Sequence, residues 1–195
     1  MVNIVLIGFM GTGKTVVGKR LAARLGWEFI DTDSEVERVT GKTIPQIFTR
    51  DGEIRFRSEE RLVVQKLALR QCLVIATGGG VVLDPENVAN LKKNGILIHL
   101  SAEPQTIYYR VKGKRHRPLL DGKDDLKRRI GELLIERAPA YQVADFTVDT
   151  SRCRPGEVVD KIVDYLKSSL SELAPSPWPS PFKGEGTNES CSGHS

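Results

Sequence analysis

The sequence has only three cysteines among its 195 residues, and they form neither a CxxC pair nor a cluster with histidine. This pattern excludes a conventional zinc site and a disulfide framework, and it is typical of reduced thiols in the cytoplasm. No apolar run approaches the length of about 20 residues that a membrane-spanning helix needs. The chain begins with strand-forming residues rather than with a basic leader and a cleavage site. We therefore expect a cytoplasmic protein without a membrane partner.

The sequence also lacks any long block of like charges, although 29 basic and 25 acidic residues leave a net charge of +4. The cations are spread along the chain, so no concentrated basic stripe indicates a nucleic-acid partner. Salt-dependent DNA binding would revive that alternative. With 39% hydrophobic and 28% charged residues, the composition is that of a globular protein. The length suits one α/β domain, which we place at residues 1–173.

Apolar runs alternate with helical patterns through this domain. The alternation predicts an α/β fold in which helices cover a mostly parallel sheet. The expected strands are residues 2–7, 27–31, 73–77, 96–100 and 146–148. The expected helices are residues 14–25, 34–40, 54–70, 85–93, 103–111, 124–137 and 155–173.

Three segments stand apart from this scaffold. Residues 33–61 carry many charges beside two phenylalanines. Residues 112–124 are basic and have glycines near both ends, which favours a mobile lid over phosphates rather than an ordinary solvated loop. Residues 174–195 alternate proline with other residues and then become polar, so we expect a disordered tail. Trp178 and Phe182 could make this tail a docking motif, but a functionless extension is favoured.

The segment from Gly8 to Thr15 fits the phosphate-loop pattern of glycine, four residues, glycine, lysine and then serine or threonine. It lies between a predicted buried strand and a predicted helix, which is the context that this motif requires. Its glycines let backbone N–H groups surround phosphate oxygens, and the helix N-terminus adds a positive dipole end. Lys14 can reach the β- and γ-phosphates, and the Thr15 hydroxyl can bind Mg²⁺. A chance glycine-rich turn is the alternative, and the context argues against it.

Two carboxylates, Asp31 and Asp33, come at the expected carboxyl end of the second strand. One can hold a metal through water while the other accepts a hydroxyl proton. Asp33 could also cap the following helix, and both roles can hold together. Farther along, Arg57 and Glu60 are spaced to pair on one helix face, which would fix the guanidinium for a carboxylate ligand. From spacing alone, a solvated helix face is favoured.

Three glycines at residues 78–80 follow the third expected strand. There the backbone can approach a ligand closely, or it can simply turn, and the position favours close approach. Arg137 ends the helix expected over residues 124–137, because Pro139 stops that helix. We therefore expect Arg137 to point into a cleft.

Together these residues resemble the shikimate kinase family over residues 2–173. The resemblance rests on six segments: GFMGTGKT at 8–15, DTD at 31–33, GEIRFRSEE at 52–60, GGG at 78–80, RPLL at 117–120 and ERAPAY at 136–141. It implies Mg²⁺-dependent transfer of the ATP γ-phosphate to the 3-hydroxyl of shikimate, in chorismate and aromatic amino-acid biosynthesis. It also implies a monomer with a three-layer α/β/α P-loop NTPase fold, a five-stranded parallel sheet, a helical substrate-binding region at residues 33–61 and the mobile lid.

The resemblance assigns roles to individual residues. Lys14 would grip the phosphates, Asp33 would be the base, and Arg117 of the lid would contact the transferring phosphate. Thr15 would ligate Mg²⁺, with Asp31 supporting the metal through water. The ATP site would comprise Gly11, Thr12, Gly13, Lys14, Thr15, Val16, Arg110, Arg117 and Arg154, with adenine near residues 151–155. The shikimate site would comprise Asp33, Gly79, Gly80, and the carboxylate-binding Arg57 and Arg137.

Three other functions fit parts of the pattern. Gluconate kinase would share the phosphate loop but not the pair Arg57 and Arg137. A switch GTPase needs an Asn-Lys-x-Asp guanine reader and an Asp-x-x-Gly switch, and the sequence has neither. A nucleic-acid-binding ATPase is favoured only by the net charge. Gln142-Val143 and the tail depart from the pattern of the shikimate kinase family.

Overall fold

The computed structural model of the chain describes residues 2–112 and 126–171. Apart from Lys112, the expected lid lies outside the described residues, and so do Arg117 and the expected tail at residues 174–195.

Five strands form one sheet in the order β2-β3-β1-β4-β5, and every neighbouring pair is parallel. After β1 the chain builds β2 and β3 on one side of it and later β4 and β5 on the other. In open α/β sheets, ligands bind at the carboxyl ends of the strands where the order reverses in this way. The strands are β1 (Asn3–Ile7), β2 (Glu28–Asp31), β3 (Leu73–Ala76), β4 (Gly95–Ser101) and β5 (Phe146–Asp149).

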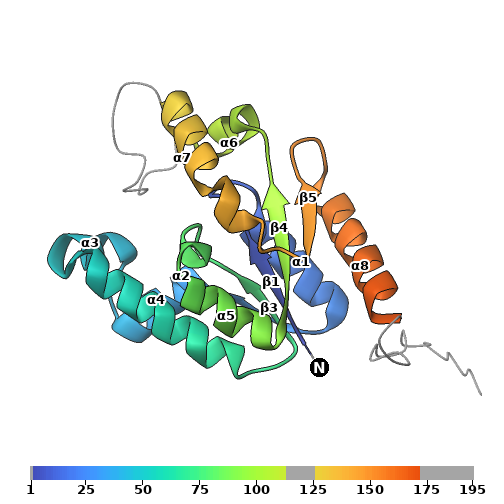
Figure 1. The fold of residues 1–195 in the computed structure, drawn as a ribbon, viewed down its shortest axis with the longest axis horizontal. Helices are drawn as coiled ribbons and strands as arrows, with labels where there is room; N and C mark the ends of the chain where they lie inside the picture. The colour runs from blue at the N-terminus through green and yellow to red at the C-terminus, as the bar shows by residue number, and fades with distance from the viewer. Residues whose placement is uncertain (1, 113–125, 172–195) are drawn as a thin grey trace, which may run out of the picture.

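Helices connect the strands and lie on both sides of the sheet (Figure 1). A single turn of 3₁₀ helix, η1 (Val81–Leu83), follows the three glycines. The α-helices of the described residues are α1 (Lys14–Leu25), α2 (Thr32–Thr40), α3 (Ile44–Arg50), α4 (Gly52–Ala68), α5 (Pro85–Lys93), α6 (Pro104–Val111), α7 (Leu126–Tyr141) and α8 (Pro155–Ser171).

The central strand β1 packs into two hydrophobic cores. Val5 and Ile7 belong to the core that α4 and α5 cover, whereas Ile4 and Leu6 belong to the core of α1 and α8. This alternation follows from the period of two in a strand, which sends successive side chains to opposite faces. Figure 1 shows α4 and α5 on one side of the sheet and α1 and α8 on the other. The predicted α/β/α arrangement with five parallel strands is confirmed. No helix in the described ranges has the length and apolarity to cross a membrane.

The sequence-based ranges omit α3. A capping box begins this helix: the Thr43 hydroxyl accepts a hydrogen bond from Gln46 N at 3.4 Å, and Gln46 Oε1 accepts one from Thr43 N at 2.9 Å. Pro45 lies in the first turn, where its missing N–H costs nothing. The start signal is therefore local, but the helix has only seven residues and the charged context obscures its apolar face.

The expectation that Pro139 stops a helix at Arg137 is wrong, because α7 continues through Pro139 to Tyr141. A proline inside a helix removes one hydrogen bond, to the carbonyl four residues earlier. That carbonyl belongs to Ile135, which is exposed like Pro139, so the hydrogen bond that Pro139 cannot make is lost on the exposed side of the helix. The buried side chains of Arg137 and Tyr141 hold the last turn in place. Arg137 is consequently a buried helical residue and not a free helix end.

Candidate functional site

The phosphate loop adopts a backbone that favours glycine at three of its positions. Gly8, Gly11 and Gly13 have φ values of 138°, 81° and 100°. A Cβ on Gly8 would collide with the carbonyl oxygen of Leu100, and a Cβ on Gly11 would lie 2.8 Å from Val111 Cγ1. Strain and crowding therefore coincide in the loop, whose backbone N–H groups precede the N-terminus of α1.

Lys14 lies over the same loop. Its Nζ donates hydrogen bonds to the carbonyl oxygens of Gly8, at 2.7 Å, and Phe9, at 2.9 Å. The ammonium group is thus held within the loop that the sequence predicts to bind phosphate.

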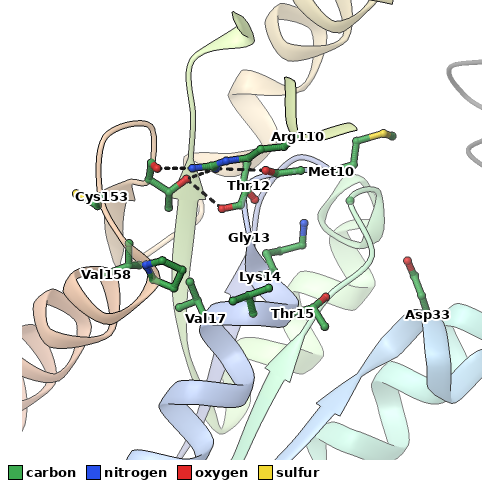
Figure 2. A pocket seen from close by; sticks show the side chains of 15 residues that line it. Met10, Thr12, Gly13, Lys14, Thr15, Val17, Asp33, Arg110, Cys153 and Val158 are labelled. Atoms are coloured by element: carbon green, nitrogen blue, oxygen red, sulfur yellow. Dashed lines mark hydrogen bonds between the residues drawn. The ribbon is translucent and has the colours of Figure 1, made fainter. Parts of the chain in front are cut away.

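A pocket of about 520 Å³ opens above the phosphate loop (Figure 2). It brings together the predicted ATP-site residues of the loop, Gly11 to Val16, with Arg110, Asp33 and Gly79. Arg154 is exposed and does not line this pocket, whereas Cys153 and Pro155 from the same segment do. The full lining is Met10, Gly11, Thr12, Gly13, Lys14, Thr15, Val16, Val17, Asp33, Gly79, Arg110, Thr150, Cys153, Pro155 and Val158.

Thr150 braces the phosphate loop, and sequence reasoning missed it. The residue follows β5 and is only 3% exposed. Its hydroxyl lies 3.0 Å from Thr12 O and 3.0 Å from Ser101 O, and it accepts from Arg110 Nη1 at 2.9 Å. Arg110 also donates to Thr150 O at 2.6 Å. A threonine after a short edge strand carries no local signal for this role, since its partners are distant in the chain.

Asp31 joins the phosphate loop to the start of α2. One carboxylate oxygen accepts a hydrogen bond from the Thr15 hydroxyl at 2.9 Å. The other accepts from the backbone N–H groups of Asp33, at 3.1 Å, and Ser34, at 3.5 Å. The N-cap of α2 is therefore Asp31 and not Asp33, because the helix already begins at Thr32. Asp33 is in the first turn of α2, and its side chain lines the pocket.

Asp33 lies against the glycine segment and beside a second carboxylate. A Cβ on Gly78 would collide with Asp33 Oδ1 and would lie 3.3 Å from Glu60 Oε1. Burial raises the pKa of Glu60, and the charge of Asp33 adds to that rise against the opposing effect of Arg57. The absence of a side chain at Gly78 thus leaves room for both acids.

Arg57 is fixed by two glutamates of its own helix. Its Nη1 donates to Glu60 Oε2 at 2.9 Å, and its Nη2 lies 3.2 Å from Glu53 Oε1. Burial lowers the pKa of Arg57, but Glu60 and Glu53 outweigh that effect and raise it overall. A Cβ on Gly80 would lie 2.9 Å from Arg57 Nη1. The pair expected from the spacing of Arg57 and Glu60 therefore forms, and it presents the guanidinium at the glycine segment.

Arg137 is the second guanidinium near this segment. It is 5% exposed, its Nη1 would lie 3.9 Å from a Cβ on Gly79, and its Cζ lies 5.8 Å from the centre of the Phe9 ring. Within residues 2–112 and 126–171, its buried Nε has no hydrogen-bond partner. A buried cationic donor that lacks a partner is costly unless a ligand supplies one.

The donor set for a metal is small. In the part of the chain that the structure describes, no group of three or more His, Cys, Asp or Glu side chains could hold a metal ion. The Thr15 hydroxyl and the Asp31 carboxylate are oxygen donors of the kind Mg²⁺ prefers, and this ion usually keeps several waters and phosphate ligands. These two residues fit Mg²⁺ that arrives with a nucleotide.

Comparison with known proteins places these residues in a family. A shikimate kinase family model matches residues 10–167. The shikimate kinase of Pelotomaculum thermopropionicum is 60% identical over 167 residues, which cover 86% of this chain and 96% of that protein. The structure of shikimate kinase from Acinetobacter baumannii in complex with shikimate matches with a TM-score of 0.83 at 39% identity, over 87% of this chain and 94% of that one.

A likeness to the rival family is one of fold alone. A gluconokinase structure from Sinorhizobium meliloti covers 88% of this chain and 94% of its own, with a TM-score of 0.55 at 16% identity. Identity this low carries no argument about the acceptor. The match to the family model and the high identity to relatives along almost their whole length identify the family. This chain belongs to the shikimate kinase family of ATP-dependent kinases.

Proposed function

We propose that the pocket above the phosphate loop holds ATP, and that the adjoining glycine segment at residues 78–80 holds shikimate, whose 3-hydroxyl receives the γ-phosphate. The observation that carries this assignment is Arg137, a buried guanidinium whose Nη1 approaches Gly79 and whose Nε lacks a hydrogen-bond partner among the described residues. A carboxylate is the partner that such a group requires. The Acinetobacter baumannii relative was solved in complex with shikimate, which is a carboxylate.

Arg57 and Arg137 approach the glycine segment from α4 and α7, and we assign both to the shikimate carboxylate. Gly80 lies against Arg57 and Gly79 lies nearest to Arg137. Since neither glycine has a side chain, the backbone leaves the ring of the acceptor room between the two guanidinium groups. Two planar donors on different helices can fix the orientation of the ring as well as attract its charge.

Asp33 is the group that accepts the proton of the acceptor hydroxyl. It lines the ATP pocket and also touches the glycine segment, so it borders both proposed ligands. Phosphoryl transfer depends mainly on positioning and charge neutralisation, and a nearby carboxylate orients the attacking hydroxyl. Arg57 pairs with Glu60 at 2.9 Å and so offsets the charge of this second carboxylate beside Asp33.

The phosphates belong on the backbone N–H groups from Gly11 to Thr15, with the Lys14 ammonium group as their cation. Thr15 would hold Mg²⁺, and Asp31 would support the metal through water. Mg²⁺ bound there supplies charge neutralisation for the β- and γ-phosphates. Arg110 and the segment 151–155 border the far end of the pocket, where we place adenine, and Arg154 remains a candidate there. Arg117 stays a predicted contact of the transferring phosphate.

We also expect a cytoplasmic monomer that has no nucleic-acid or membrane partner. Size-exclusion chromatography with light scattering tests the monomeric state. A salt titration with labelled DNA tests the absence of nucleic-acid binding.

The decisive experiment measures ADP release by the purified full chain with ATP and Mg²⁺, using shikimate, gluconate, nucleoside monophosphates or no acceptor. Turnover with shikimate alone is the expected result, and turnover with another acceptor would remove the carboxylate-pocket assignment. Arg137→Lys keeps the charge but loses the fork, so it should raise the KM of shikimate by about tenfold or more and leave that of ATP unchanged. Arg129→Lys, on the exposed side of the same helix, is the matched control.

A further inference from the structure

Gly79 lies where three parts of the site meet. A Cβ on Gly79 would lie 3.5 Å from Met10 N, 3.8 Å from Gly8 O and 3.9 Å from Arg137 Nη1. Its backbone is therefore packed between the phosphate loop and the guanidinium assigned to the acceptor. A shift of this peptide would therefore change the shape of the acceptor site beside Arg137.

Tyr141 restrains the Gly79 peptide through a hydrogen bond. Its hydroxyl donates a hydrogen bond to Gly79 O at 3.0 Å, and the side chain is only 4% exposed. Burial raises the pKa of Tyr141 to about 12, against the charge of Arg137 and a hydrogen bond from it, so the hydroxyl keeps its proton at neutral pH and can donate to Gly79 O. Arg137 and Tyr141 are four residues apart on α7 and hence on one face. A single helix turn thus carries both the acceptor guanidinium and the clamp on Gly79.

His99 on β4 completes the support. Its ring stacks on the Tyr141 ring with centroids 4.8 Å apart and planes at 9°. Its Cδ2 would lie 3.3 Å from a Cβ on Gly8, so the imidazole packs between Tyr141 and the first residue of the phosphate loop. The chain of contacts runs from the loop through His99 and Tyr141 to Gly79.

We infer that Tyr141 and His99 are positioning residues for the acceptor: Tyr141 sets the place of the Gly79 peptide, and His99 fixes the Tyr141 ring against the phosphate loop. Neither side chain touches the reacting atoms. Their effect should fall on acceptor binding, because Gly79 O is the atom that Tyr141 restrains and Gly79 borders the acceptor. The inference rests on the proposed assignment of Gly79 and Arg137 to that site.

The test is steady-state kinetics of the full chain with Tyr141→Phe, which removes one hydroxyl and keeps the stacked ring. We expect the KM of shikimate to rise about five- to tenfold, the range of one lost hydrogen bond, with kcat and the KM of ATP changed by less than about twofold. His99→Ala should raise the KM of shikimate similarly, because Tyr141 loses its stacking partner. His99→Phe restores a flat ring and should return the KM to within about twofold of the original.

Tyr165→Phe is the matched control. Tyr165 also stacks on an aromatic ring of a strand, Phe146, at 4.2 Å, and its hydroxyl also donates to a backbone carbonyl, Asp145 O, at 3.3 Å, but it lies on α8 in the other core. Its kinetic constants should not change. The inference is overturned if Tyr141→Phe leaves the KM of shikimate unchanged, or raises both KM values equally as general loosening would.

Arg137→Lys separates this failure from failure of the site itself. If Arg137→Lys raises the KM of shikimate and Tyr141→Phe does not, only the positioning role is wrong. If neither variant affects shikimate, the acceptor site is wrongly assigned, and the positioning role is overturned with it.

Discussion

The hydroxyl of Thr15 donates a hydrogen bond to the Asp31 carboxylate across 2.9 Å, joining the first turn of α1 to the end of β2. Since the other oxygen of the same carboxylate caps α2, Asp31 organises the starts of two helices at once. The metal-supporting role that we propose for Asp31 would therefore share one side chain with a structural role, and the two roles can be separated experimentally.

Asp31→Asn should make that separation. Asparagine caps helices as well as aspartate does, so the thermal midpoint should hardly change. The loss of the negative charge should raise the Mg²⁺ concentration for half-maximal activity by about 10- to 100-fold. A magnesium titration of kcat measures this. Asp84→Asn is the control, because Asp84 caps α5 through Glu86 N in the same way. Equal magnesium dependence in both variants would contradict the metal role.

Lys14→Ala should lower kcat/KM by about 10³-fold or more, because it removes the cation held over the phosphate loop. ADP release with shikimate, followed over a range of ATP concentrations, gives kcat/KM for ATP. Lys19→Ala removes an exposed lysine of the same helix and should leave turnover intact. Turnover by Lys14→Ala at the original rate would refute the phosphate-gripping role.

Gly8→Ala should destabilise the protein by about 3 kcal/mol or more, since the Cβ meets a fixed carbonyl, that of Leu100, at a left-handed φ. Gly26→Ala introduces the same methyl at a φ of 67° with no heavy atom within 4 Å, so strain alone should cost about 1 kcal/mol. Urea unfolding of both variants measures the difference. Similar losses would show that the close packing of β4 against the loop contributes little.

His99 should make the protein less stable as the pH falls. Burial, followed by the charge of Lys14, lowers the pKa of His99, so the unfolded chain takes up a proton near pH 6.5 that the folded chain still refuses. Stability from this residue is complete above pH 6.5 and is lost as the pH falls through the lower folded pKa, by at most about 1.4 kcal/mol per pH unit. His99→Phe should flatten that part of the curve of unfolding free energy against pH. An identical slope in both proteins would contradict it.

The elements with strong local signals could be predicted from sequence. Glycines at fixed spacing after an apolar run identify β1 and the start of α1. The apolar runs of β3 and β4 are long enough to predict both strands. The path of α7 could not be predicted, because the rule that proline ends a helix is local, whereas burial of Arg137 and Tyr141 is a tertiary effect. Helix α3 could not be predicted for a different reason: it is short, and charged residues flank it.

The candidate site divides in the same way. Residues that contact a ligand through a recurring motif, such as Lys14 and Thr15, are visible in the sequence. Residues that hold those contacts in place are not, because Thr150 and His99 act on partners far away in the chain and belong to no motif. The family resemblance supplies roles for Arg57 and Arg137, but their burial and their partners come only from the folded chain.

The bracing of the phosphate loop by Thr150 has a consequence for synthesis of the protein. Thr150 and Thr12 are 138 residues apart, so the motif is translated well before the residue that supports it. A nascent chain that ends after β4 contains every residue of the glycine-rich motif, yet it has neither Thr150 nor the segment that closes the far end of the pocket. Nucleotide affinity should therefore appear abruptly once β5 has left the ribosome, and fragments that stop before Thr150 should bind ATP weakly although they keep the motif intact.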